Sequence, residues 1–417
     1  MTATPATQAT QATRQPGSPA AGARVVLVQT RLPRYREPVF QALRDALATQ
    51  GIAFDLVHGQ PTAAERRRGD EGALPWAQAV PNRYLTVRGT ALVWQGLPAC
   101  TRQADLLILT QENRILSNYP ALAWPRASRR VAFFGHGRNF QARAPGGLAE
   151  RFKRRLIHAV DWWFAYTELS RDWLIGCGYP AGRITSVDNA MDVDGLRADL
   201  HSARAQGLPA TLRAELGIAP QAPVGLYCGA LYAEKRLDLL VAAAQVARAH
   251  GSDLHLLVIG DGPLGPWLRE QAATRPWLHA LGARHGVPKA ACFAAADVVL
   301  NPGLVGLHVL DAFAAGLPMI TTRDAAHSPE IAYLQDGVNG LLADGNAQAF
   351  ASASLALLAD PATHDRLASA AGATADRFTV NHMARRFAQG IVECLSAPPQ
   401  GRTARRPARR LAGAGPG

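Results

Sequence analysis

The sequence predicts an α/β protein built from two doubly wound parallel sheets, one in each half, facing each other across a cleft. Three observations lead to this fold class. Short hydrophobic runs alternate with amphipathic helical segments, which is typical of parallel sheets covered by helices. The alternation stops in a polar, Ala-rich stretch near residues 195–220 and then starts again. A length of 417 residues with 48% hydrophobic content is sufficient for two cores.

The first half, residues 23–195, is predicted to form the first domain. Strands are expected at 24–29, 54–58, 105–109, 130–134, 162–166 and 183–187, and helices at 37–49 and 169–177. In the first of these helices, Val39, Phe40, Leu43 and Leu47 share one face. Residues 196–220 contain Gly207, Pro209 and Pro220, so we expect a linker with one short helix around Leu212.

The second domain is predicted over residues 221–378. Strands are expected at 224–228, 255–259, 279–281, 298–301, 319–322 and around Leu341, with helices at 237–249, 264–273, 289–295 and 329–335 and another opening at Gly306. A last helix within 379–396 carries Met383, Phe387 and Ile391 on one face. We expect it to return toward the first domain and tie the two halves together.

The net charge of +12 is concentrated in a few places. The tails, residues 1–22 and 397–417, have compositions typical of disorder, and the second is rich in arginine. The arginines at 66–68 are interpreted as a solvated face. The basic cluster at 151–155 lies in a helical pattern and suggests contact with an anionic membrane. Nucleic-acid binding is disfavoured, because the arginines are scattered and no recognition motif accompanies them.

The five cysteines are far apart and form no Cys-x-x-Cys pair, which indicates a reducing compartment. The sequence has no run of 18 apolar residues and no hydrophobic leader in its first 22 residues. We therefore expect a cytoplasmic protein, with peripheral contact at the inner face of the cell membrane as a further hypothesis.

Four loops in the second half follow directly on predicted strands: residues 229–235, 260–263, 302–307 and 327–330. Parallel sheets bind ligands at the carboxyl ends of their strands, so these loops are expected to share one site. A helix opening at Gly306 would offer the backbone N–H groups of Val305, Gly306 and Leu307 to a phosphate. Asp311, one turn further, would accept hydrogen bonds from sugar hydroxyls. The pattern is that of a nucleotide-sugar site.

Residues 222–345 resemble the donor half of the family 4 glycosyltransferases, which have the two-domain GT-B fold. The resemblance rests on residues 227–235, 258–263, 306–318 and 329–341, in the family's order and spacing. Segments 33–36, 135–139 and 187–192 of the first half are also similar to those of bacterial members.

The resemblance implies a hexosyltransferase that moves a sugar from a nucleoside-diphosphate sugar to a glycan or lipid-linked acceptor in cell-surface polysaccharide or glycolipid synthesis. It also implies retention at the anomeric carbon. Lys235 would steady the diphosphate leaving group, and Glu330 would contribute to catalysis. Gly229, Gly260 and Gly262 would let backbone approach the donor.

Two positions depart from the family pattern. Ala230 stands where many members carry a second phosphate-binding arginine, a role for which Arg236 is a candidate substitute. The family usually shows two glutamates separated by seven residues, and here these positions are Gly303 and Asp311. Loss of the first glutamate removes a contact to the donor sugar, which backbone N–H groups of residues 305–307 or Glu330 would have to replace.

The acceptor is expected in the first half. His136 follows a predicted strand between two glycines and is a candidate catalytic residue, with Arg138 two positions further on. Arg34, Tyr35 and Arg36 lie in the first strand-to-helix turn, and their charge suits a lipid diphosphate or a phosphorylated glycan.

Other reaction classes are not supported, because the sequence has no P-loop, no Gly-x-Ser-x-Gly elbow and no His-Glu-x-x-His pair. The pair Asp192 and Asp194 is interpreted as a helix-start or loop pair, so no metal and no cofactor are expected. Two alternatives stay open: a nucleotide-sugar epimerase on the same fold, and a non-catalytic scaffold that binds anionic surfaces.

Overall fold

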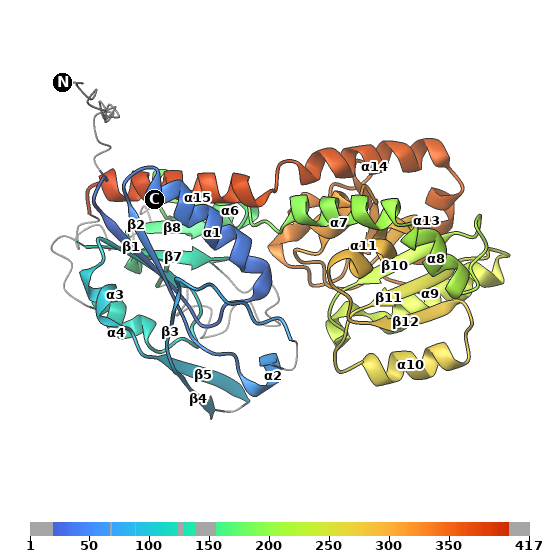
Figure 1. The fold of residues 1–417 in the computed structure, drawn as a ribbon, viewed down its shortest axis with the longest axis horizontal. Helices are drawn as coiled ribbons and strands as arrows, with labels where there is room; N and C mark the ends of the chain where they lie inside the picture. Colours follow the sequence, from blue (N-terminus) through green and yellow to red (C-terminus); the bar gives the residue numbers. More distant parts are fainter. Residues whose placement is uncertain (1–19, 67–68, 88, 124–128, 138–155, 400–417) are drawn as a thin grey trace, which may run out of the picture.

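The computed structural model describes residues 20–66, 69–87, 89–123, 129–137 and 156–399. Two parallel sheets, each with helices around it, form two lobes that lie side by side (Figure 1). The predicted fold class, with two Rossmann-like sheets, is confirmed. None of the described helices combines the length and the apolar character needed to cross a membrane.

The first sheet has seven parallel strands in the order β3-β2-β1-β6-β7-β8-β9. Hydrophobic side chains cover both of its faces, as expected for a doubly wound sheet. The strands are β1 (Arg24–Gln29), β2 (Ala53–His58), β3 (Gln78–Ala79), β6 (Leu106–Thr110), β7 (Arg130–Gly135), β8 (Trp162–Ala165) and β9 (Ile184–Ser186). The helices of this lobe are α1 (Glu37–Ala48), α2 (Ala63–Arg66), α3 (Ala99–Gln103), α4 (Asn118–Ala123) and α6 (Glu168–Gly176), with 3-10 turns η1 (Arg34–Arg36), η2 (Ile157–Ala159) and η3 (Ala181–Arg183).

The last helix, α15 (Val380–Ser396), packs on the first lobe although it follows the second in the chain (Figure 1). The Phe387 ring lies 5.1 Å from that of Phe134 and 4.5 Å from that of Phe164, measured between centroids. Its apolar face thus completes the core beside α1, and the chain crosses between the lobes a second time.

The second sheet has six parallel strands in the order β12-β11-β10-β13-β14-β15. They are β10 (Val224–Cys228), β11 (His255–Ile259), β12 (Leu278–Gly282), β13 (Val298–Leu300), β14 (Met319–Thr322) and β15 (Gly340–Ala343). Around them lie α9 (Leu237–Ala249), α10 (Gly265–Ala273), α11 (Gly286–Ala294), α12 (Val309–Ala314), α13 (Ala347–Leu358) and α14 (Pro361–Ala375), with η4 (Ala233–Lys235) and η5 (Pro329–Tyr333).

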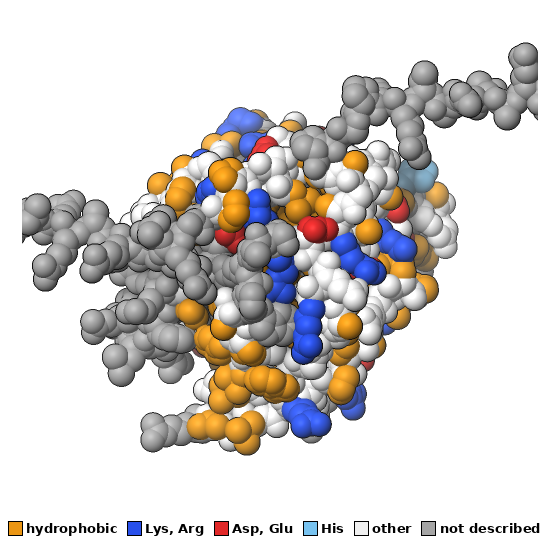
Figure 2. Space-filling view, turned by 90° about the vertical axis from the view of Figure 1, so that its left-hand side faces the viewer, with side chains coloured by type: hydrophobic (Ala, Val, Ile, Leu, Met, Phe, Trp, Pro, Cys, Tyr) orange, Lys and Arg blue, Asp and Glu red, His pale blue; other side chains and the backbone are white. Residues whose placement is uncertain are grey.

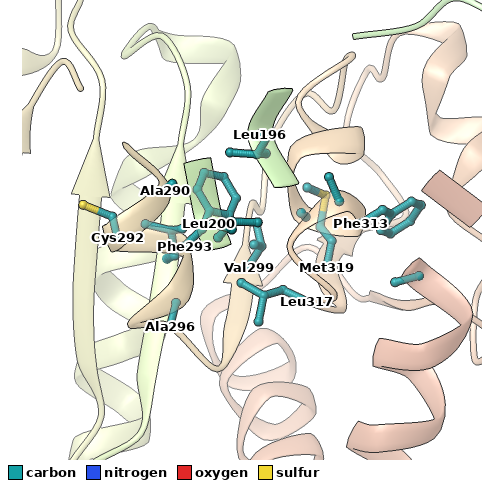
Figure 3. Packing of buried hydrophobic residues seen from close by; sticks show 14 of the residues in the cluster. Leu196, Leu200, Ala290, Cys292, Phe293, Ala296, Val299, Phe313, Leu317 and Met319 are labelled. Carbon is teal, nitrogen blue, oxygen red and sulfur yellow. The ribbon is translucent and has the colours of Figure 1, made fainter. Parts of the chain in front are cut away.

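The stretch predicted as a linker is largely helical, so the expectation of a single short helix there was wrong. Residues 196–220 contain most of α7 (Val193–Ala205) and all of α8 (Leu208–Glu215), and only the helix around Leu212 was expected. Leu196 and Leu200 of α7 are buried in the same cluster as Phe293 of α11 (Figure 3). Asp192 caps α7 by accepting a hydrogen bond from the Gly195 N–H at 2.9 Å, which agrees with its interpretation as a helix start.

A two-stranded antiparallel hairpin, β4 (Asn82–Val87) and β5 (Thr90–Gln95), was not predicted. Its position is decided by contacts with loops far away in the sequence, which a local pattern does not reveal. Another correction concerns the expected helix opening at Gly306: α12 begins at Val309 and is six residues long. Asp311 therefore lies in its first turn.

Candidate functional site

The carboxyl edges of the two sheets meet at Asn189 and Glu330. Asn189 follows β9 in the first lobe, and its side-chain amide donates to Glu330 Oε1 at 2.7 Å. The hydroxyl of Tyr333 in turn donates to the Asn189 carbonyl at 3.1 Å. Glu330 is the second residue of η5, which follows β14, and it is 3% exposed. The loops that follow strands in both sheets therefore face each other, as expected for a site shared by two lobes.

Lys235 is a buried cation at the centre of the second lobe's loops. It ends η4, is 4% exposed, and its Nζ donates to the Leu304 carbonyl at 2.6 Å. Burial lowers the pKa of Lys235 to about 8, so the ammonium is still mostly protonated at neutral pH. The prediction that Lys235 lies beside the loop containing Gly306 agrees with this geometry, because Leu304 is only two residues from Gly306.

The loop after β13 packs backbone to backbone against the turn that contains Lys235. The Leu304 N–H donates to the Glu234 carbonyl at 2.8 Å. A Cβ at Gly303 would lie 2.3 Å from the Lys235 carbonyl carbon and 2.4 Å from the Glu234 oxygen. No side chain fits at this position. The absence of the family's first glutamate is therefore a structural feature of this chain, tied to how closely the two loops approach.

The backbone groups proposed to bind phosphate are not equivalent. The Val305 N–H donates to His327 Nδ1 at 3.1 Å, so it is already engaged. The other ring nitrogen, His327 Nε2, lies 2.7 Å from the Thr322 carbonyl and must carry the proton. Burial lowers the pKa of His327, consistent with this neutral form. Gly306 and Leu307 are half-buried and follow directly, so they are the better placed donors.

Asp311 has a partner that the sequence did not indicate. Its Oδ2 lies 2.9 Å from Lys289 Nζ of α11, and Asp311 itself is 6% exposed. Although burial alone would lower it, the pKa of Lys289 is raised because Asp311 lies beside it. Lys289 was assigned to a helix but to no site, because ion-pair partners on different elements leave no local pattern.

His308 lies between the two lysines. Burial, Lys235 and Lys289 together hold the pKa of His308 well below its usual value, so the ring is neutral. Its Nε2 is buried and makes no hydrogen bond to the described residues. The second lobe thus brings two ammonium groups, one carboxylate and a neutral imidazole together near the end of β10.

Arg236 does not take the place of the missing arginine at Ala230. Its guanidinium donates to Asp324 at 3.1 and 3.2 Å and to the Gly345 carbonyl at 2.8 Å, which ties it to the loops after β14 and β15. Arg236 itself has φ 53°, a left-handed conformation between η4 and α9. The second cation near Lys235 is Lys289.

The glycines at 229, 260 and 262 bring two loops together. A Cβ at Gly260 would lie 1.9 Å from the Gly229 carbonyl oxygen, and one at Gly262 would lie 2.5 Å from the Leu231 carbonyl oxygen. Main-chain hydrogen bonds from Gly229 to Ile259 and from Leu231 to Asp261, both 3.0 Å, hold this contact. Contact with a donor is an additional role that remains a prediction.

On the first lobe, Arg36 lies in an aromatic surround. It is 4% exposed, and its guanidinium carbon is 5.1 Å from the Tyr35 ring centre, 5.3 Å from that of Tyr166 and 5.8 Å from that of Phe134. Burial opposes its charge, yet nearby Tyr35, Tyr166 and Glu330 leave the pKa of Arg36 raised. No carboxylate of the described residues lies within salt-bridge distance of it.

The other first-lobe candidates occupy different environments. His136 follows β7 and packs edge-on against Tyr166, with 4.4 Å between centroids. Arg34 and Tyr35 are exposed at the start of α1. Arg138 and the basic cluster at 151–155 lie outside the described residues. The structure therefore brings His136, Arg36 and Glu330 to one region through Tyr166 and leaves Arg34 at the surface.

Comparison with known proteins identifies the second lobe. Residues 222–360 match the family model described as glycosyl transferases group 1. The match lies within the second lobe and confirms the resemblance to the glycosyltransferases. The matched residues include Lys235, Lys289 and Asp311.

Two curated relatives share part of this family sequence. The chain is 32% identical over 146 residues to the GDP-mannose-dependent alpha-(1-6)-phosphatidylinositol dimannoside mannosyltransferase of Mycobacterium tuberculosis, covering 34% of this chain and 37% of the relative. It is 33% identical over 207 residues to the D-inositol 3-phosphate glycosyltransferase of Nocardia farcinica, covering 45% and 43%. The chain thus matches less than half of the length of these relatives.

The likeness to solved structures extends over both lobes. Anabaena HepE in complex with UDP superposes with a TM-score of 0.63 at 17% identity, covering 88% of this chain and 99% of that one. At this identity the comparison concerns the fold alone, which is the GT-B fold expected for the family.

Proposed function

We propose that this protein is a glycosyltransferase that moves a hexose from a nucleoside-diphosphate sugar to a glycan or lipid-linked acceptor. The observation that carries the proposal is the convergence of Lys235, Lys289 and Asp311 around the loop 303–307 in a glycosyl transferases group 1 domain. Buried cations of this kind suit a diphosphate, whose charge grows as the glycosidic bond breaks.

Each donor-side group has a proposed role. Lys235 exchanges its bond to the Leu304 carbonyl for a phosphate oxygen, and the N–H groups of Gly306 and Leu307 bind the same diphosphate. Asp311 keeps one oxygen on Lys289 and accepts a ribose hydroxyl with the other. Gly229, Gly260 and Gly262 keep the floor of this site free of side chains. Because the Val305 N–H already donates to His327, Val305 is proposed to support the site indirectly and no longer to contact the donor.

The acceptor side is proposed to lie at the first lobe's edge. Arg34, Tyr35 and Arg36, with Arg138, would bind an anionic acceptor. His136 and Glu330 would border the reacting sugar, since Glu330 is where the two lobes touch. A retaining reaction, with the donor phosphate assisting deprotonation of the acceptor hydroxyl, is part of the proposal, as is a place in cell-surface polysaccharide or glycolipid synthesis. The five cysteines form no disulfide, which suits the proposed cytoplasmic location.

The first experiment is a thermal-shift titration with UDP, GDP and ADP, because a ligand that binds only the folded protein raises its melting temperature. The relatives named for GDP-mannose and the UDP complex of Anabaena HepE make GDP and UDP the first choices. We expect one of them to stabilise the wild type and to stabilise Asp311→Ala much less. No shift with any nucleotide would favour the scaffold alternative.

Activity separates the two enzyme classes. Incubation of the matching nucleotide sugar with and without a lipid-phosphate acceptor should give a transferred sugar only when the acceptor is present. An isomerised nucleotide sugar formed without any acceptor would identify an epimerase and overturn the proposal.

A further inference from the structure

One face of the β4–β5 hairpin is exposed and apolar. Of the six large hydrophobic side chains most exposed among the described residues, three lie here: Leu85 at 61%, Trp94 at 49% and Val87 at 43%. The register pairs Leu85 with Leu92 and Arg83 with Trp94, so these side chains share one face. Figure 2 shows hydrophobic side chains gathered at the lower end of the molecule, where Figure 1 places the hairpin.

The opposite face of the hairpin is fixed to the protein. Val93 is fully buried, and the Gln95 amide donates to the Gln29 carbonyl at 2.8 Å. Asn82 donates to the Thr30 carbonyl at 2.7 Å. Isolated two-stranded hairpins are marginal in water, so these anchors hold the apolar face outward in a defined orientation.

The anchors also place the hairpin beside the proposed acceptor edge. Thr30 follows β1 directly and precedes the turn that holds Arg34 and Arg36. The Tyr84 hydroxyl donates to the carbonyl of Gln60, which follows β2, and the Val93 N–H donates to the carbonyl of Arg114, which follows β6. The exposed face therefore borders the carboxyl edge of the first sheet.

The chain segment that forms the hairpin carries charge of one sign. No acidic residue occurs between Glu71 and Asp105, whereas that stretch contains three arginines, and Arg83 lies on the exposed face itself. An exposed tryptophan with aliphatic neighbours and arginine is the combination that favours the interface of an anionic bilayer. A protein partner of ordinary composition requires no such one-sided charge.

We propose that the β4–β5 hairpin is a membrane-docking element that inserts Leu85, Val87 and Trp94 into the interface of an anionic lipid bilayer, with Arg83 bound to lipid headgroups. Docking there brings the carboxyl edge of the first sheet next to the membrane surface. This inference rests on the proposed function only for the purpose of docking, which is that a lipid-linked acceptor would reach Arg34 and Arg36 without leaving the bilayer.

The test is sedimentation of the full chain with vesicles, which needs neither donor nor acceptor. We expect strong binding to vesicles of equal parts phosphatidylglycerol and phosphatidylcholine and weak binding to phosphatidylcholine alone. Leu85→Ser/Trp94→Ser should reduce binding to the anionic vesicles by about tenfold or more. Arg83→Gln should reduce it by about fivefold, an effect that added salt removes.

The matched control is Leu169→Ser/Val338→Ser, which removes two other exposed hydrophobic side chains (39% and 47%) away from the hairpin. It should bind vesicles as the wild type does, and all variants should keep the wild-type melting temperature. Equal binding by the hairpin variant and the wild type would overturn the proposal. A second result would also overturn it: the wild type does not bind vesicles but forms dimers in a concentration-dependent way, as detected by light scattering, and the hairpin variant does not form them. Because no sugar transfer is measured, a failure of the proposed function leaves this result interpretable.

Discussion

At the carboxyl edges of both sheets, positive charge lies beneath the protein surface, but it is stabilised in different ways. In the second lobe the buried charges are held by protein groups: Lys235 by the Leu304 carbonyl and Asp311 by Lys289. In the first lobe Arg36 is surrounded by three aromatic rings and has no ion pair among the described residues. Backbone geometry therefore defines the site in the second lobe, and side-chain packing defines the site in the first lobe.

This difference explains what each side is suited to bind. Close loop packing through Gly303 and Gly260 leaves a rigid outline that fits one invariant group, such as a diphosphate. In the first lobe, cation–π attraction to the faces of three aromatic rings stabilises the Arg36 guanidinium instead. Under the proposed function, the second lobe would bind the constant diphosphate of the donor and the first lobe the acceptor.

The largest effect that would test the comparison is expected from Lys235→Ala. Loss of the ammonium should lower kcat by about 10²–10³-fold, because charge developing on the diphosphate loses its buried partner. The measurement is steady-state transfer at saturating donor, together with a melting curve. If the variant kept wild-type kcat, the donor side would not depend on this cation, and the contrast between the lobes would lose its basis.

The next largest effect is expected from Lys289→Met. Removal of one member of a buried pair leaves Asp311 uncompensated, at a cost of about 3 kcal/mol in the free energy of unfolding. Chemical denaturation measures this cost, and nucleoside-diphosphate affinity should fall in parallel. Lys289→Arg, which retains the charge, is the control and should recover most of both. A fully stable Lys289→Met protein would contradict the pairing.

The glycine that replaces the family's first glutamate offers a smaller, purely structural test. Gly303→Ala should destabilise the fold by about 1–3 kcal/mol, because its Cβ would overlap the Lys235 and Glu234 backbone. The adjacent Gly306→Ala is the matched control: its Cβ would meet only Ser328 Oγ, at 3.8 Å. Equal urea midpoints for the two variants would contradict the close contact between Gly303 and the turn that contains Lys235.

These contrasts also explain how far the sequence alone was informative. The alternation of strands and helices predicted both sheets, and glycine and lysine in loops after strands predicted which loops of the second lobe lie together. The same local signals missed Lys289, because its partner Asp311 lies on another helix. They also placed a helix start at Gly306, whereas α12 begins at Val309 after a turn at Leu307 and His308. The loop before that turn is held by hydrogen bonds from Leu304 to Glu234 and from Val305 to His327.

Less of the first lobe's site could be predicted from the sequence, for the same reason. Arg36 was grouped with Arg34 as a charged acceptor residue, but burial beneath Tyr166 and Phe134 is a tertiary outcome that adjacent residues do not reveal. Likewise α7 was interpreted as part of a linker, because residues 196–220 are broken by Gly207, Pro209 and Pro220. Its Leu196 and Leu200 spacing identified a helix face only once α11 was there to cover it.

The last prediction separates the two lobes by pH. Burial lowers the pKa of Lys235 to about 8, whereas the pKa of Arg36 is raised and its charge persists. The donor should bind the protonated Lys235, so donor KM should be flat below pH 8 and rise above it by about tenfold per pH unit, while acceptor KM stays constant. Unfolding restores the ordinary lysine pKa, so the unfolded chain binds more protons between the two pKa values, and the ligand-free protein should gain stability from this group as pH rises through that window. Lys235→Arg should remove the inflection in donor KM. Parallel rises in donor and acceptor KM would show that one shared titration governs both edges.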